Sequence, residues 1–334
     1  MSAPAPAAGS TVRRRQSSLG ALGPLHDRLL WYVLLAAALG LAWPAGAARL
    51  EGAVPLMLAG QVAGVTLTLT ARQLLRSVRR PRPVLVALAV QWLVIAPAGI
   101  AFGRLLGGGT VGTGVVICAV VPAEITSSLV AVLAGGSGEV GILVMAGSLA
   151  LGTVLTPLLV TLGVGGSAHV DAAALTLELA LCVALPLVVG VALRTRINGL
   201  AAQGARCLDL AAISVVLVVF VAAGTARDLI GSLALLGAAG ACLVLQAMSY
   251  GIGLGVGRLL RLPRAVGRAV LFPMGMREFG IATAVALSVA PGSTAVAGVY
   301  GILVMVTGPA LAMRLRHSAR RAAEPSRRPP KQGG

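Results

Sequence analysis

From Leu29 to Met313 the chain is a series of apolar segments separated by short gaps, and the gaps hold most of the internal arginines. A membrane-spanning helix needs about 20 apolar residues, because the hydrocarbon core of a bilayer is about 30 Å thick. Apolar residues make up 57% and charged residues 11% of the 334, whereas soluble domains carry about a quarter charged residues. The sequence therefore predicts an all-α polytopic membrane protein.

Ten segments of spanning length fit into this stretch. We expect ten transmembrane helices near residues 29–46, 53–71, 84–106, 111–134, 139–163, 173–194, 209–226, 232–257, 266–290 and 295–313. Residues 26–315 would form one transporter domain. Residues 1–25 and 316–334 would be disordered basic tails, because their composition is too polar to build a core.

The arginines between these segments are distributed unequally. With a cytoplasmic N-terminus, only Arg49, Arg104 and Arg227 would lie in gaps on the outer side. Positive charge marks the cytoplasmic ends of membrane helices. We therefore expect a multi-pass protein of the cell (inner) membrane with both termini cytoplasmic. The net charge of +17 comes largely from arginines in these gaps and in the tails, and aromatic residues are scarce, at 3%. We therefore expect no nucleic-acid partner.

Two of the expected spans are interrupted by a proline. Pro122 lies in the fourth span and Pro273 in the ninth. A proline frees a helix carbonyl at membrane depth, which is tolerated only beside a cavity or polar partners. If ten spans form a five-plus-five inverted repeat, the two breaks fall at matched positions. Such paired breaks are typical of the midplane binding site of a secondary transporter.

The ionisable residues that lie most clearly inside these broken spans are Glu124, Arg277 and Glu278. A charge buried at this depth costs at least about 2.5–3.5 kcal/mol, so each should have a partner or face water. In one interpretation Arg277 binds an anionic substrate while a carboxylate carries a proton or cation. In the other, the three residues form a structural salt bridge between the broken helices.

Uncharged polar side chains accompany the first break. Hydroxyl groups after a helix break can bind an anion or a hard cation, although they also bond back to their own helix. A lone amide in the third span contacts a ligand or an ion more readily than it faces lipid. We therefore expect the substrate site to include Thr126, Ser127, Ser128 and Gln91.

Three motifs resemble the bile acid:sodium symporter family. They are Arg79–Val84 leading to Gln91–Pro97, Pro122–Gly136, and Gly275–Ala284. The resemblance extends over about Leu29 to Met313. It implies ten helices, an inverted repeat, a panel and a core domain, and two crossing broken helices around the site.

The positions that hold sodium in this family are largely changed, to Ser127-Ser128, Gly141, Met145, Pro273 and Arg277-Glu278. Gly141 and Met145 offer no side-chain oxygen, and a guanidinium repels sodium unless a carboxylate neutralises it. A weak sodium site would use what remains, namely Gln91, Ser127, Ser128, Met274 and Met276. Coupling to sodium is therefore doubtful, and coupling to a proton or uncoupled transport stays open.

These observations favour a secondary transporter that moves a small organic anion by alternating access. Arg277 would contact the anion, while Glu124 and Glu278 would balance charge or carry the coupling proton. An oxyanion exporter like the arsenite permeases and a non-transporting membrane sensor are the alternatives. We expect no enzymatic activity and no cofactor beyond the coupling ion, since the spans hold no nucleophile–base pair, metal cluster or phosphate loop.

Overall fold

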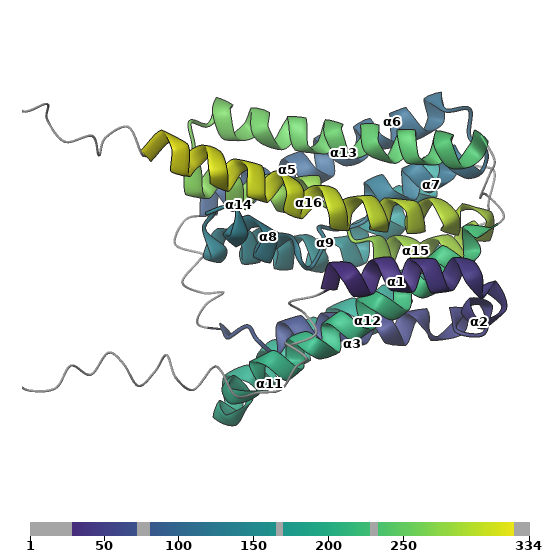
Figure 1. The fold of residues 1–334 in the computed structure, drawn as a ribbon, viewed down its shortest axis with the longest axis horizontal. Helices are drawn as coiled ribbons and strands as arrows, with labels where there is room; N and C mark the ends of the chain where they lie inside the picture. The colour runs from purple at the N-terminus through teal and green to yellow at the C-terminus, as the bar shows by residue number, and fades with distance from the viewer. Residues whose placement is uncertain (1–28, 72–80, 165–169, 228–232, 324–334) are drawn as a thin grey trace, which may run out of the picture.

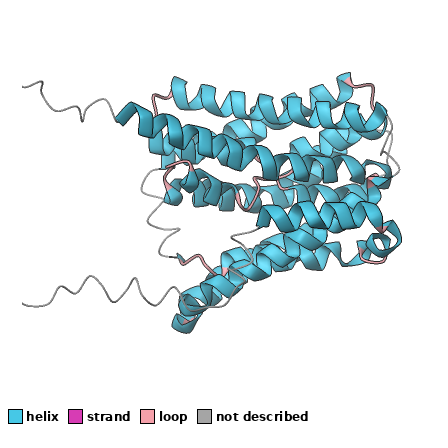
Figure 2. Ribbon diagram, in the orientation of Figure 1, coloured by secondary structure: helices cyan, strands magenta, loops and turns pink. Residues whose placement is uncertain are grey.

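The computed structural model describes residues 29–71, 81–164, 170–227 and 233–323, which form helices joined by short loops (Figure 2). Two helix pairs, α5 with α6 and α10 with α11, are joined by a π-helical turn, at Gln91–Ile95 and Ala180–Ala184. The α-helices are α1 Leu29–Ala42, α2 Pro44–Ala48, α3 Val54–Thr66, α5 Pro81–Val90, α6 Ala96–Leu105, α7 Gly109–Val120, α8 Ser127–Leu133, α9 Gly138–Val164, α10 Ala172–Leu179, α11 Leu185–Arg196, α12 Gly204–Thr225, α13 Leu233–Leu259, α14 Arg264–Gly275, α15 Phe279–Val289 and α16 Thr294–Ala323.

Each expected span coincides with one helix or one pair of helices. The helices long and apolar enough to cross a membrane are Pro81–Leu105, Gly138–Val164, Ala172–Arg196, Gly204–Thr225, Leu233–Leu259 and Pro291–Ser318. Large apolar side chains such as Trp31 and Leu177 are exposed on the outside of the bundle, as lipid contact requires. The all-helical membrane fold is confirmed, whereas ten spans and the inverted repeat stay predictions.

The last helix, α16, is longer than expected. It continues to Ala323, so residues 316–323 are helical rather than part of a disordered tail. Arg and Ala favour helix, and the sequence contains no helix breaker between Pro309 and Pro325. The N-terminal tail at 1–25, the arginines at 72–80 and the rest of the C-terminal tail lie outside the described residues.

The helices form two groups that lie side by side (Figure 1). The panel group contains α1, α2, α3 and α10–α12, in which α12 packs along both α1 and α3. The core group contains α5–α9 and α13–α16. Helices α12 and α15 are among the elements that join the groups, through contacts of α12 with α16 and of α15 with α3. Both broken helices belong to the core group.

Candidate functional site

The first helix break runs from Val121 to Thr126. Helix α7 ends at Val120 and the chain is extended at Val121, with φ −85° and ψ 159°. Pro122 lies in this break, as predicted, and packs against Gly152 of α9, where a Cβ would lie only 2.9 Å from the proline side chain. The hydroxyl of Thr156 donates to the carbonyl of Val120 at 2.8 Å. Helix α9 thus supplies a hydrogen-bond donor to a carbonyl at the end of α7, which lipid could not supply.

The second break begins later than the sequence suggested. Pro273 lies inside α14, which ends at Gly275, and the extended residues are Met276 to Glu278. A proline removes only its own N–H donor. The last turn is still closed by the N–H of Met276, which donates to the carbonyl of Phe272 at 2.9 Å. The predicted break at Pro273 is therefore wrong in position by a turn of helix.

Gly275 allows Tyr250 of α13 to lie against the end of α14. A Cβ at this position would lie 2.1 Å from the tyrosine ring. We expect Gly275→Ala to lower the free energy of unfolding by about 1–3 kcal/mol, the usual cost of overpacking. Thermal unfolding in detergent measures this. Gly251→Ala on α13 is the matched control, because a Cβ there meets nothing within 4 Å and should leave the Tm equal or slightly higher. An unchanged Tm for Gly275→Ala would contradict the predicted overlap.

The two breaks cross and hydrogen-bond to each other. Ala123 and Arg277 face each other in an antiparallel bridge. The N–H of Glu124 donates to the carbonyl of Met276 at 2.9 Å, and the N–H of Glu278 donates to the carbonyl of Pro122 at 2.9 Å. The backbone groups freed by one break are thus satisfied by the other. The crossing of two broken helices, which the resemblance implied, is present.

This bridge separates the three charged residues. Successive side chains of an extended chain point to opposite sides. Arg277 therefore lies on the side opposite to Glu124 and Glu278. In the part of the chain that the structure describes, no hydrogen bond of the Arg277 side chain involves a carboxylate. The expected cluster, in which both carboxylates neutralise the guanidinium, does not form.

Glu278 is fully buried and accepts hydrogen bonds from several N–H groups. Its Oε2 accepts from the backbone of Ile125 at 3.0 Å. Its Oε1 accepts from Nε2 of Gln61 at 3.1 Å and from the backbone of Gly280 at 3.3 Å. Gln61 belongs to α3, so this carboxylate links the panel group to the core group.

Glu124 is also fully buried but has fewer donors. Its Oε1 accepts from the backbone N–H of Thr126 at 3.4 Å and from the hydroxyl of Thr126 at 3.3 Å. Its Oε2 has no donor. Glu124 and Glu278 are neighbouring buried carboxyl groups that lie on the same side of the bridge and influence each other electrostatically. Two neighbouring carboxyl groups repel each other when both are ionised, so the pair can bind and release one shared proton.

On the opposite side, Gln91 lies against the Arg277 side chain, and Ser148 hydrogen-bonds to Gln91. The Gln91 amide is oriented with Oε1 toward the guanidinium, since the reverse would place its NH2 against donors. Oε1 then accepts from Nη1 of Arg277 at 2.8 Å, from the backbone of Ala123 at 3.3 Å and from the hydroxyl of Ser148. Nη1 of Arg277 also donates to the carbonyl of Val121 at 3.4 Å. Among the residues that the structure describes, the Arg277 atoms Nε and Nη2 have no acceptor.

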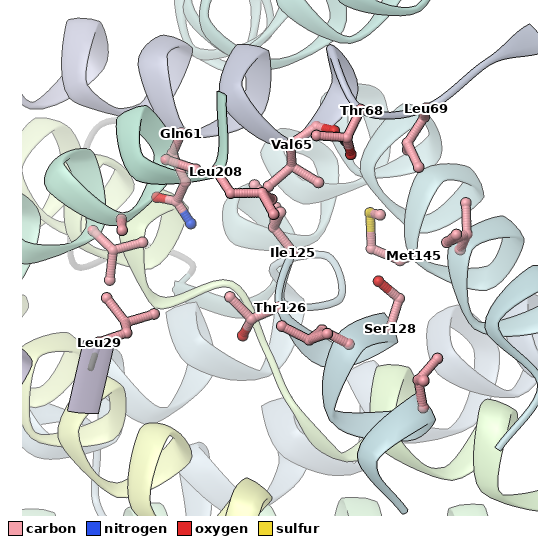
Figure 3. Close-up of a pocket in the computed structure, with 16 residues that line it drawn as sticks. Leu29, Gln61, Val65, Thr68, Leu69, Ile125, Thr126, Ser128, Met145 and Leu208 are labelled. Carbon is pink, nitrogen blue, oxygen red and sulfur yellow. Dashed lines mark hydrogen bonds between the residues drawn. The ribbon is translucent and has the colours of Figure 1, made fainter. Parts of the chain in front are cut away.

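A cavity of about 260 Å³ lies between the panel and core groups (Figure 3). Its wall includes Gln61 and Thr126, whose side chains hydrogen-bond to Glu278 and Glu124. Of the residues predicted to bind substrate, Thr126 and Ser128 line this cavity, whereas Gln91, Glu124, Ser127, Arg277 and Glu278 do not. The wall is predominantly apolar. It consists of Leu29, Gln61, Val65, Thr68, Leu69, Ile125, Thr126, Ser128, Leu129, Val132, Ile142, Met145, Leu208, Ala211, Ala212 and Val215.

The structure separates the residues of the predicted weak sodium site. Oε1 of Gln91 faces the guanidinium, and the carbonyl of Met276 accepts the Glu124 N–H. Ser128 opens onto the cavity beside Met145, while Ser127 is buried without a partner for its hydroxyl. These residues do not fit a sodium ion, because a fixed positive charge lies against the retained amide ligand.

Three polar residues of the site escaped the sequence analysis: Gln61, Ser148 and Tyr300. Gln61 carried the same signal as Gln91, a single amide in an apolar span. Ser148 and Tyr300 carried none, because hydroxyls in membrane helices commonly bond to their own backbone. Here the Ser148 hydroxyl accepts from the Ala123 N–H at 2.8 Å, and the Tyr300 oxygen accepts from the Arg277 N–H at 3.2 Å.

The sequence is similar to known proteins. The model of the Sodium Bile acid symporter family matches residues 55–233, more than half of the chain. The chain belongs to this family. A relative described as an uncharacterized sodium-dependent transporter YocS, from Bacillus subtilis (strain 168), is 23% identical over 286 residues. That match covers 84% of this chain and 88% of the relative.

Membership confirms the resemblance and identifies a multi-pass transmembrane transporter of the sodium bile acid symporter family. A family of transporters also agrees with the expectation of a protein that is not an enzyme. The matched residues 55–233 include the first break. The second break, with Arg277 and Glu278, lies beyond them.

Proposed function

We propose that the protein is a secondary transporter that moves a small organic anion with an apolar body, together with a proton, by alternating access. The observation that carries this proposal is the position of the cavity. It lies between the two helix groups and borders Gln61 and Thr126, which hold the two buried carboxyl groups. The cargo site and the proton site would therefore both lie at the interface between the two helix groups, which moves during transport.

The cavity wall favours an organic cargo over a small oxyanion. Apolar side chains would cover the cargo, while the hydroxyls of Thr126 and Ser128 would hydrogen-bond its polar end. The residues described along the wall include no Arg or Lys, which oxyanion recognition commonly uses. A carboxylate next to Glu124 and Glu278 would be repelled unless a proton accompanied it. We therefore assign the charge compensation to a proton and not to Arg277.

The carboxyl pair would couple this proton to the conformational change. Glu278 accepts from Gln61 of α3, so the bond crosses the boundary between the panel and core groups. A displacement of one group against the other would break this bond and change the surroundings of the shared proton. Alternating access would then depend on whether proton and cargo are bound together.

We place the protein in the cell (inner) membrane with both termini cytoplasmic. The arginines at the ends of α11, α13 and α16 lie at the end of the bundle where α5 and α14 begin (Figure 1). Arg104 and Arg227 lie at the other end. This asymmetry supports the orientation, because positive charge is concentrated on the cytoplasmic side of membrane proteins.

Uptake into proteoliposomes tests the cargo class. We expect accumulation of radiolabelled monocarboxylates with an apolar body, and no accumulation of the corresponding alcohols or of arsenite. Arsenite flux without carboxylate flux would favour the oxyanion exporter. Saturable carboxylate binding without flux would favour the membrane sensor. Either result would overturn the proposed function.

A further inference from the structure

The Arg277 side chain is buried away from the cavity between the helix groups and on the side of the bridge opposite to both carboxylates. It is fully buried, and its Nη1 donates to two neutral oxygens, Oε1 of Gln91 at 2.8 Å and the carbonyl of Val121 at 3.4 Å. It does not line the cavity between the helix groups. Cargo recognition therefore does not explain this arginine.

Packing in an apolar core does not explain this arginine either. A buried charge without a counter-ion is destabilising, and an apolar side chain of similar size would avoid that penalty. The atoms Nε and Nη2 are buried without an acceptor, which adds to the cost. The buried position of Arg277 therefore holds a positive charge for a reason other than apolar packing.

The oxygens that face the guanidinium are of the kind that coordinates a hard cation. Amide and carbonyl oxygens are ordinary ligands of such ions. They lie where the two breaks cross, at the bridge between Ala123 and Arg277. A free sodium ion does not fit beside Nη1, because the guanidinium already lies 2.8 Å from the amide oxygen.

We propose that the guanidinium of Arg277 is a built-in cation, which takes the place of a bound sodium ion and holds the two crossing breaks together. The protein would therefore need no sodium, although it belongs to a family named for sodium symport. The inference deepens the proposed function, on which its consequence for transport rests. Its consequence for ion binding does not depend on any cargo.

Thermal unfolding in detergent tests the proposal without transport. We expect the wild-type Tm to be equal in sodium chloride and in choline chloride. Arg277→Gln removes the charge and keeps an amide, so its Tm should fall in choline and recover by several degrees in sodium. Arg268→Gln is the matched control, since Arg268 also bonds only carbonyls, those of Ala134 and Leu315. That variant should lose stability equally in both salts.

A second variant covers the case in which Arg277→Gln does not fold. Arg277→Ala leaves space for a free cation, and low millimolar guanidinium should raise its Tm while leaving the wild-type Tm unchanged. A sodium-dependent increase of the wild-type Tm would overturn the proposal. So would Arg277 variants that respond to neither sodium nor guanidinium. These readouts stay informative if the organic-anion proposal fails, because no cargo is present.

Discussion

Replacing Glu124 by glutamine is expected to abolish proton-driven accumulation of cargo. An amide at this position can donate to the neighbouring Glu278 carboxylate, as a shared proton would, but it cannot release that proton. The pair would be fixed in its protonated arrangement. We therefore expect net uptake driven by a pH gradient to fall to the level of empty liposomes. Exchange of cargo across the membrane should continue, because exchange needs no proton release.

The control for this prediction is Glu139→Gln. Glu139 is exposed in the first turn of α9 and lies outside the cavity wall. It should accumulate cargo as the wild type does. If Glu124→Gln also accumulates cargo against a gradient at the wild-type rate, the carboxyl pair is not the proton site.

Filling the cavity is expected to block binding. Ala211 is buried on α12 and faces the space between the helix groups, so Ala211→Phe would add a ring to a cavity of about 260 Å³. If cargo must displace this ring at a cost of about 1–3 kcal/mol, cargo should bind roughly 5- to 150-fold more weakly. Equilibrium binding of labelled cargo to the solubilised protein measures this change directly.

Ile213 supplies the matched control, because it lies on the same helix and is 48% exposed on the outside of the bundle. Ile213→Phe should bind cargo with unchanged affinity and insert into membranes normally. Equal affinities for the two variants would show that cargo binds elsewhere, and the assignment of the cavity would then be wrong.

Much of the architecture could be predicted from hydropathy, because a bilayer requires long apolar helices. The approximate position of the two helix breaks also followed from sequence, since the region around Pro122 and Pro273 combines helix breakers with buried charge. The exact position of the second break could not be predicted from sequence. A proline removes one hydrogen bond but leaves the helix free to continue, so only the packing of Gly275 against Tyr250 and the extended residues after it show where α14 ends.

The salt bridge of Arg277 with Glu124 and Glu278, one of the two interpretations of the sequence, is not formed among the described residues. Arg277 and Glu278 are adjacent in sequence, and in a helix both could reach Glu124. The extended bridge instead turns the arginine toward Gln91 and the glutamate toward Gln61. The sequence alone could not show that these two side chains point to opposite sides, because the extended geometry forms only when the two breaks pair in the folded chain. For the same reason Gln61 was recognised as part of the site only in the folded chain.

Reconstituted uptake with pH and sodium gradients imposed separately tests the central claim most directly. We expect an inward proton gradient to drive accumulation of an apolar-bodied carboxylate in sodium-free buffer. We expect a sodium gradient at equal pH on both sides to drive none. Accumulation driven by sodium alone would contradict both the shared proton at Glu124 and Glu278 and the built-in cation at Arg277.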